Sequence, residues 1–218
     1  MTTSLSLPQQ LQAHTFDGSI QQITDRMIED LITSLADPET LTAEEQRGII
    51  ARYSAVLEGN FIYWMTATLL SVQSEAARPI LLDNLHEEVR DAHPAMLRRF
   101  AIAADAFPKD TDALAIHEEL TKVRLFLARL SPVQSLLTMA FFEGFIQRFM
   151  PYLAELAAAR GSAEMEYTDV HGVCDIGHTA GLFRALEEEM FVSPLDPDKD
   201  LFEGVNFLRT LIVRIVCN

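Results

Sequence analysis

The chain has 218 residues, of which 49% are hydrophobic and 22% are charged, and its formal net charge at pH 7 is −15. Strong negative charge argues against a nucleic-acid partner, because phosphates would be repelled rather than neutralised. Charged residues interrupt each apolar stretch before it reaches the ~20 residues that a membrane-spanning helix needs, so we expect no membrane span. The length supports a sizeable core, and no Pro/Gly/Ser-rich linker divides the sequence, so we expect one domain over residues 1–218.

Two features predict a cytoplasmic location. Residues 1–14 contain no basic segment followed by an apolar one, which argues against a secretory signal. The two cysteines, Cys174 and Cys217, are too few for a disulfide framework and fit a reducing compartment. We therefore expect a cytoplasmic protein.

Apolar residues recur at helical spacing along the chain, whereas strand patterns and glycine-rich phosphate loops do not occur. Thr42 with Glu45 forms a capping-box signature, and Gly161 suits the end of a helix. A break is expected at His93-Pro94, because proline disrupts a helix interior. We predict an all-α, single-domain bundle of seven helices, over residues 17–35, 42–73, 74–104 (interrupted at 93–94), 112–130, 132–160, 163–190 and 201–216.

Three metal-capable side chains, His171, Asp175 and His178, fall at positions i, i+4 and i+7 of the sixth predicted helix. These positions share one helix face, so two imidazoles and a carboxylate could converge on one point. Neutral imidazole with carboxylate suits iron, manganese or zinc. The segment is a poor helix by propensity because it contains Gly172 and Gly177, and a metal ion could hold it in register. The alternative explanation is an exposed polar face.

Two glutamates are predicted to lie among apolar neighbours. Within one helical turn, Glu58 has residues such as Phe61, and Glu143 has residues such as Ile146. Gly144, beside Glu143, would allow another backbone to approach. An unpaired buried carboxylate is costly, and its usual remedies are protonation, a cationic partner or a metal ion.

An acidic pair, Glu87 and Glu88, precedes His93 in the third predicted helix. The spacing of five residues from Glu88 to His93 is awkward on a regular helix, but a distortion near Pro94 could bring both to one site. A solvated acidic face is the alternative. With the residues above, this gives four carboxylates and three imidazoles, enough for two divalent cations in a helical bundle.

In order and spacing these residues resemble the haem-oxygenase-like di-iron oxidases and oxygenases, over about residues 58–178. In that family one helix gives a Glu, the next an acidic pair followed by a His, a later helix a Glu, and the last core helix His-x3-Asp-x2-His. The resemblance implies a seven-helix haem-oxygenase-like fold, and it assigns the metal ligands Glu58, Glu88, His93, Glu143, His171, Asp175 and His178. The interval between Glu88 and His93 is shorter than usual, which leaves Glu87 as an alternative to Glu88.

The resemblance also implies the chemistry. It predicts two Fe(II) ions as cofactors, O2 as co-substrate, and a small organic substrate, with no catalytic residue beyond the metal ligands. Reactions in the family include oxidative cleavage, N-oxygenation and nitrile or alkene formation, and an amino acid or derivative in natural-product biosynthesis is the preferred substrate. A metal-free enzyme of the same fold, similar to thiaminase or to quinone-cofactor synthesis enzymes, and a non-catalytic helical binding protein are the alternatives. A homodimer is possible.

Overall fold

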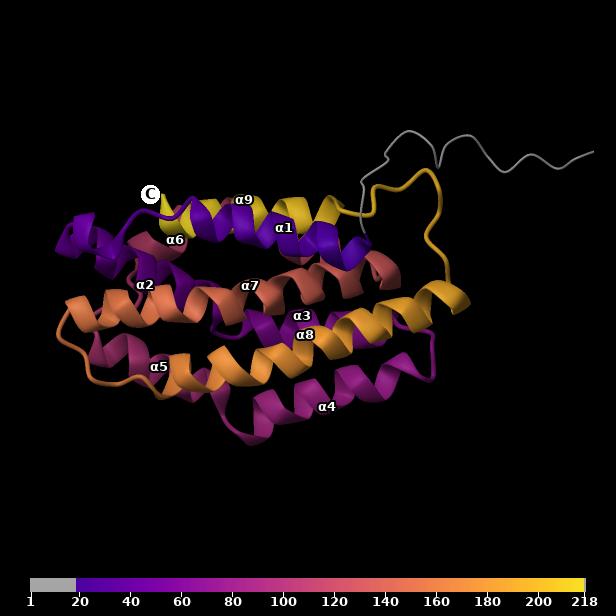
Figure 1. Cartoon of the computed structure of the whole chain (residues 1–218), viewed down its shortest axis with the longest axis horizontal. Helices are drawn as coiled ribbons and strands as arrows, with labels where there is room; N and C mark the ends of the chain where they lie inside the picture. The colour runs from indigo at the N-terminus through magenta and orange to yellow at the C-terminus, as the bar shows by residue number, and fades with distance from the viewer. Residues whose placement is uncertain (1–18, 218) are drawn as a thin grey trace, which may run out of the picture.

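The computed structural model describes residues 19–217, which form α-helices, one short 3-10 helix and no strand (Figure 1). The elements are α1 (Ile20–Thr33), η2 (Pro38–Thr40), α2 (Ala43–Leu57), α3 (Asn60–Ser71), α4 (Ala77–Arg90), α5 (His93–Ala103), α6 (Asp110–Leu127), α7 (Pro132–Ala159), α8 (Glu166–Val192) and α9 (Glu203–Val216). The predicted all-α fold is confirmed. Within this part of the chain, none of the helices combines the length and the apolar character needed to cross a membrane.

Two of the predicted helices are each divided in two. The predicted helix over residues 42–73 ends at Leu57 and begins again at Asn60, because Glu58 has extended backbone and Gly59 is left-handed, with a φ of 79°. The sequence did not predict this break. The break expected at His93-Pro94 is present, since Ala92 has a φ of 55° and Pro94 lies in the first turn of α5.

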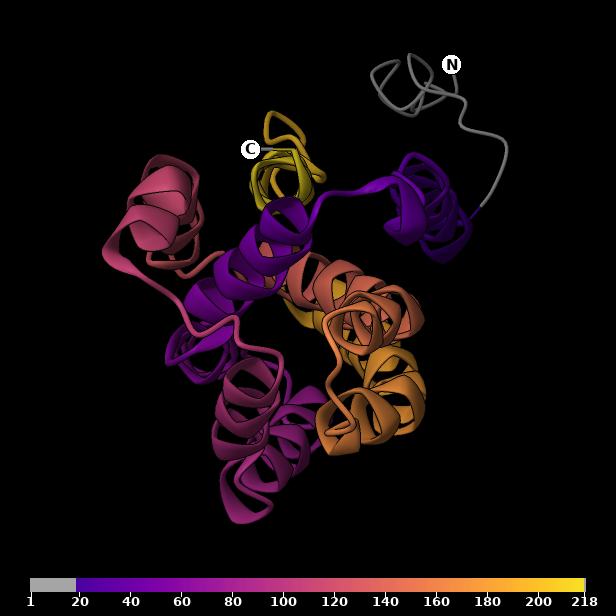
Figure 2. The same cartoon turned by 90° about the vertical axis from the view of Figure 1, so that its left-hand side faces the viewer.

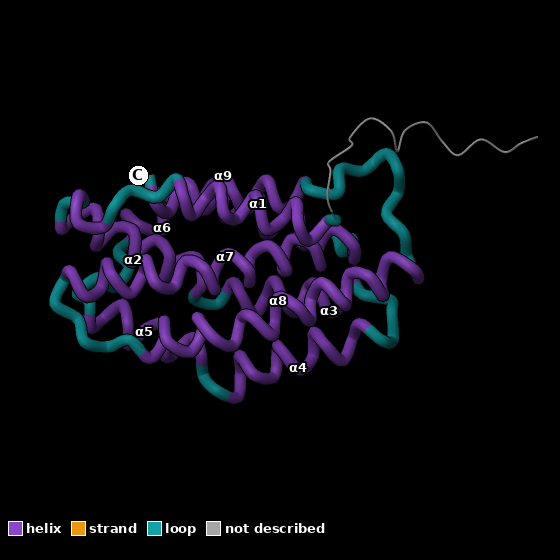
Figure 3. The backbone as a smooth tube through the Cα atoms, in the orientation of Figure 1, coloured by secondary structure: helices purple, strands orange, loops and turns teal. Residues whose placement is uncertain are grey.

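Local sequence signals explain several helix ends. Thr42 and Glu45 form the predicted capping box at the start of α2, and Ser19 forms another at the start of α1. Gly161, with a φ of 82°, follows the end of α7 as predicted. The longest connection between described helices, residues 193–202, joins α8 to α9 (Figure 3).

Helix α7 is the central element of the bundle. Residues 133–146 of this helix are all buried, and α7 packs against α1, α2, α3, α8 and α9. Helices α4 and α5 lie on the opposite side of the bundle from α1 and α9, and both pack on α8 (Figures 1 and 2). Helices α4, α5, α7 and α8 therefore surround one common region, and all predicted ligands except Glu58 lie on these four helices.

Gly144 permits the close packing expected for it. A Cβ atom at Gly144 would lie 3.0 Å from the Ile28 side chain of α1 and 3.4 Å from the Thr179 side chain of α8. The first distance is tighter than ordinary van der Waals contact, so a larger residue would require the Ile28 side chain to shift by a few tenths of an ångström. The small residue thus keeps α1 and α8 close to the part of α7 that carries Glu143.

Candidate metal centre

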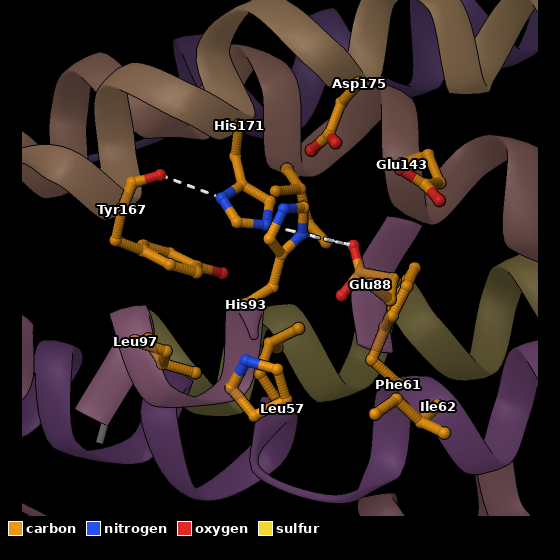
Figure 4. Close-up of a pocket in the computed structure, with 12 residues that line it drawn as sticks. Leu57, Phe61, Ile62, Glu88, His93, Leu97, Glu143, Tyr167, His171 and Asp175 are labelled. Carbon is orange, nitrogen blue, oxygen red and sulfur yellow. Dashed lines mark hydrogen bonds and ion pairs between the residues drawn. The ribbon is translucent and has the colours of Figure 1, made fainter. Parts of the chain in front are cut away.

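The predicted ligands of α4, α5, α7 and α8, except His178, line one pocket, which we call the ligand pocket (Figure 4). Its polar lining consists of residues that are each 5% exposed or less, namely Glu88, His93, Glu143, His171 and Asp175. The rest of the lining is Tyr167 and six apolar residues: Leu57, Phe61, Ile62, Pro94, Leu97 and Ile146. In Figure 4, Leu57, Phe61, Ile62 and Leu97 lie across the pocket from Asp175.

Glu88, His93 and His171 form the first ligand group, with potential ligand atoms within 4.8 Å of one another. The Oε1 atom of Glu88 lies 2.7 Å from Nδ1 of His93 and 4.0 Å from Nε2 of His171. The left-handed residue Ala92 turns the chain between α4 and α5, and so brings Glu88 and His93 together. The awkward sequence interval is thus resolved by the break near Pro94.

Within the described part of the chain, both histidines of the first ligand group form a hydrogen bond through Nδ1 and none through Nε2. A carboxylate and a carbonyl oxygen can only accept, so His93 donates from Nδ1 to Glu88, and His171 donates from Nδ1 to the Tyr167 carbonyl at 2.8 Å. Burial lowers the pKa of His171 to about 4, so this imidazole is neutral at pH 7. A neutral imidazole oriented through its other nitrogen is the form that binds metal ions.

Glu143, Asp175 and His178 form the second ligand group. Nδ1 of His178 lies 3.5 Å from Oδ1 of Asp175 and 3.6 Å from Oε2 of Glu143, which is too far for strong hydrogen bonds. Cys174 donates from Sγ to Oδ1 of Asp175 at 3.2 Å, and Cys174, Asp175 and His178 also have potential ligand atoms within 4.8 Å of one another. Cys174 is thus an additional donor beside this group.

The second ligand group contains buried polar atoms that the described part of the chain leaves without a hydrogen-bond partner. These atoms are Oδ2 of Asp175, Nδ1 of His178 and, in the neighbouring Asn84, Oδ1. An unsatisfied buried acceptor costs about 1–3 kcal/mol. A cation among these atoms would satisfy several of them at once, so the donor set fits a bound metal ion, and carboxylate with imidazole is suited to iron.

The pKa values of Asp175 and His178 indicate that the second ligand group lacks a positive charge to balance its carboxylates. Burial, and then the charge of Glu143, raise the pKa of Asp175 to about 8. Burial alone would lower the pKa of His178, but the nearby carboxylates of Asp175 and Glu143 raise it to about 11. Protons therefore offset the negative charge at pH 7, and a divalent cation would replace them.

The prediction that Glu58 points into the core is wrong. Its side chain is 45% exposed, and its Oε1 atom lies 3.7 Å from the guanidinium of Arg98. The prediction assumed that one continuous helix runs through Glu58, whereas the break at Gly59 turns this residue away from the face of Phe61. The structure does not bring Glu58 to the other predicted ligands, and α2 and α3 contribute only apolar residues to the ligand pocket.

The structure places both members of the acidic pair near the ligands, in different positions. Glu88 is buried beside His93, whereas the half-exposed Glu87 accepts a hydrogen bond from Nε2 of His178 at 2.8 Å. This bond leaves Nδ1 of a neutral His178 free toward Asp175. Glu88 therefore lies with His93 and His171, whereas Glu87 contacts His178.

Two further groups at the site lie outside the set of predicted metal ligands. Asn84 donates from Nδ2 to Oε1 of Glu143 at 2.8 Å, and both residues are buried. Tyr167, whose ring centroid lies 4.2 Å from that of His171, shares a hydrogen bond of 2.8 Å with the buried hydroxyl of Tyr53. Asn84 lies four residues before Glu88, on the same helix face, and this spacing is a signal that could have found it.

Comparison with curated proteins and with solved structures gives no match. Residues 26–205 match a protein family described as iron-containing redox enzyme. The matched segment includes all residues of both ligand groups, and it confirms the resemblance drawn from the sequence. The chain belongs to this haem-oxygenase-like family of iron-containing redox enzymes.

Proposed function

We propose that the protein is a non-haem di-iron oxidase or oxygenase that uses O2 to oxidise a small organic substrate, namely an amino acid or derivative in natural-product biosynthesis. One observation carries this proposal. Two adjoining groups of carboxylate and imidazole donors converge from four helices, and one group contains buried atoms without a partner among the described residues. Each group has the donors that a ferrous ion prefers.

The charge of the site supports two ions. Three carboxylates, those of Glu88, Glu143 and Asp175, are buried together, and the carboxylate of Glu87 lies against His178. One divalent ion would leave buried negative charge uncompensated, whereas two ions bring four positive charges to four carboxylates. The six side chains of the two ligand groups would fill all six positions of a single six-coordinate ion and leave none for O2.

Bound ferrous iron would supply the electrons for O2 reduction, chemistry that protein side chains do not provide. The residues of the chain have supporting roles. The Tyr167 carbonyl and Glu87 orient His171 and His178, and Asn84 holds Glu143. The apolar wall that includes Leu57 excludes water from the ligands and accepts an apolar part of the substrate.

Anaerobic Fe(II) titration followed by metal analysis tests the proposal. We expect about two equivalents in the wild-type protein and about one in the Glu143→Ala variant, while Glu58→Ala still binds two. The loaded protein should then consume O2, faster with the correct member of a panel of amino acids. Intact folding without iron binding would favour the metal-free alternative, and a single equivalent in the wild type would contradict a di-iron centre.

A further inference from the structure

A second depression, which we call the outer hollow, adjoins the ligand pocket. It lies among α2, α5 and the segment before α6, and is lined by Ser54, Glu58, Pro94, Leu97, Arg98, Ala101, Phe107 and Pro108. Two residues, Pro94 and Leu97, line both the outer hollow and the ligand pocket. These two side chains therefore separate the surface of the protein from the predicted metal ligands.

The character of the lining changes from the surface inward. At the outer end, the side chains of Glu58 and Arg98 are 45% and 60% exposed, and the Arg98 guanidinium lies over the ring of Phe107. Further in, Leu97 is buried, and beyond it lies the apolar wall of the ligand pocket. The charged residues adjoin this wall directly, because Leu57 precedes Glu58 and Leu97 precedes Arg98.

The polar side chains that line the ligand pocket are mainly acidic. Among the described residues, those that line it include neither lysine nor arginine, and three of them are acids. Arg98 supplies a guanidinium at the outer end of the same path. Its ion pair with Glu58 is long, at 3.7 Å, and exposed, so it contributes little to stability and can open for a ligand.

We infer that Glu58 and Arg98 bind the charged head group of the substrate, an α-amino acid with an apolar side chain. Arg98 binds the carboxylate and Glu58 the ammonium group, while the side chain passes Pro94 and Leu97 toward the first ligand group. The assignment of the occupant as a substrate rests on the proposed function. It also places the atom that is oxidised on the side chain of the amino acid, away from its α-carbon.

Binding requires a local movement. The cavity within the ligand pocket measures about 20 Å³, room for an ion or a water molecule, and the outer hollow measures about 0 Å³. An amino acid must therefore displace Leu97. This residue belongs to the same turns of α5 as His93 and Arg98, so head-group binding and the position of a metal ligand are connected through one short segment.

Isothermal titration of the full-length protein under anaerobic conditions tests the inference, with L-norleucine, L-leucine, L-phenylalanine and L-tryptophan as probes. We expect at least one to bind. For norleucine, the matched analogues hexanoate and pentylamine, which lack the ammonium and the carboxylate, should bind at least tenfold more weakly. The variants Arg98→Ala and Glu58→Gln should each weaken binding of the same amino acid at least tenfold.

Arg99→Ala is the matched control, because Arg99 is also exposed on α5 but pairs with Glu166 and lines neither pocket. It should bind the probe within twofold of the wild type. Circular dichroism verifies that the variants are folded. The inference is overturned if no amino acid of the panel binds, if the analogues bind equally well, or if Arg98→Ala has no effect. Since the titration needs neither iron nor O2, it stays informative if the di-iron proposal fails.

Discussion

The two ligand groups differ in how fully the protein satisfies them. In the first, His93 and His171 each donate a hydrogen bond, to Glu88 and to the Tyr167 carbonyl. In the second, the contacts of His178 with Asp175 and Glu143 are longer than 3.4 Å, and two buried atoms have no partner among the described residues. The hydrogen bonds of the first group orient its histidines without a metal ion, whereas the second group leaves buried polar atoms unsatisfied within the described part of the chain. We therefore expect the first group to bind iron more tightly.

The largest expected effect is the loss of Fe(II) affinity when one of the two ligand groups is mutated. His93→Ala should lower the affinity for the more tightly bound Fe(II) ion more than 100-fold, because it removes a ligand from the first ligand group. Asp175→Ala should abolish binding of the more weakly bound ion, while the other ion keeps an affinity near that of the wild type. Anaerobic titration of each variant measures both ions. Loss of both ions in both variants would show that the groups act as one unit.

The second prediction concerns pH and the stability of the metal-free protein. Between pH 6.5 and 8, Asp175 and His178 bind more protons in the folded state than in the unfolded state, because their folded pKa values are about 8 and about 11. Their contribution to stability is present at lower pH and is lost as the pH rises. The free energy of unfolding should fall by about 1–3 kcal/mol across this range.

Chemical denaturation of the metal-free protein at several pH values measures this dependence. His171 has a lowered pKa in the folded state and affects stability mainly below pH 6.5. It therefore does not offset the fall in the free energy of unfolding between pH 6.5 and 8. Asp175→Asn should flatten the dependence, and bound metal should reverse it, because metal binding displaces the protons. A metal-free protein that becomes more stable from pH 6.5 to 8 would disprove the proposed charge state of the second group.

The smallest predicted effect comes from a residue that supports a ligand. Asn84→Ala should lower the affinity for the ion at the second ligand group about tenfold, because Glu143 loses the hydrogen-bond donor that orients it. The first ion should be unaffected. His86→Ala is the matched control, since His86 is exposed on the same helix. An equal loss of affinity in both variants would indicate a general effect on α4 instead of a specific effect on Glu143.

The sequence predictions are accurate where the feature depends on residues close together in the sequence. His171, Asp175 and His178 lie on one helix, so helical geometry alone fixes their common face. The break before Pro94 was predictable because proline acts locally. The break at Gly59 was not, because apolar residues continue at helical spacing on both sides of a single glycine.

The error at Glu58 and the omission of Tyr53 have related causes. Glu58 was assigned from neighbours at helical spacing, and that argument fails where the helix is interrupted. Tyr53 reaches the site through a hydrogen bond to Tyr167, which is 114 residues away in the sequence. A contact of this kind depends on the tertiary fold, and no local pattern encodes it.

The hydrogen bond between His171 and the Tyr167 carbonyl has a consequence for mutational tolerance. Its acceptor is a backbone atom, so a substitution at position 167 that keeps the helix also keeps the bond. The bonds that orient His178 and Glu143 come from the side chains of Glu87 and Asn84, which a single nucleotide change can remove. Genetic drift can therefore alter the second metal position readily, whereas the orientation of His171 is protected by the helix itself.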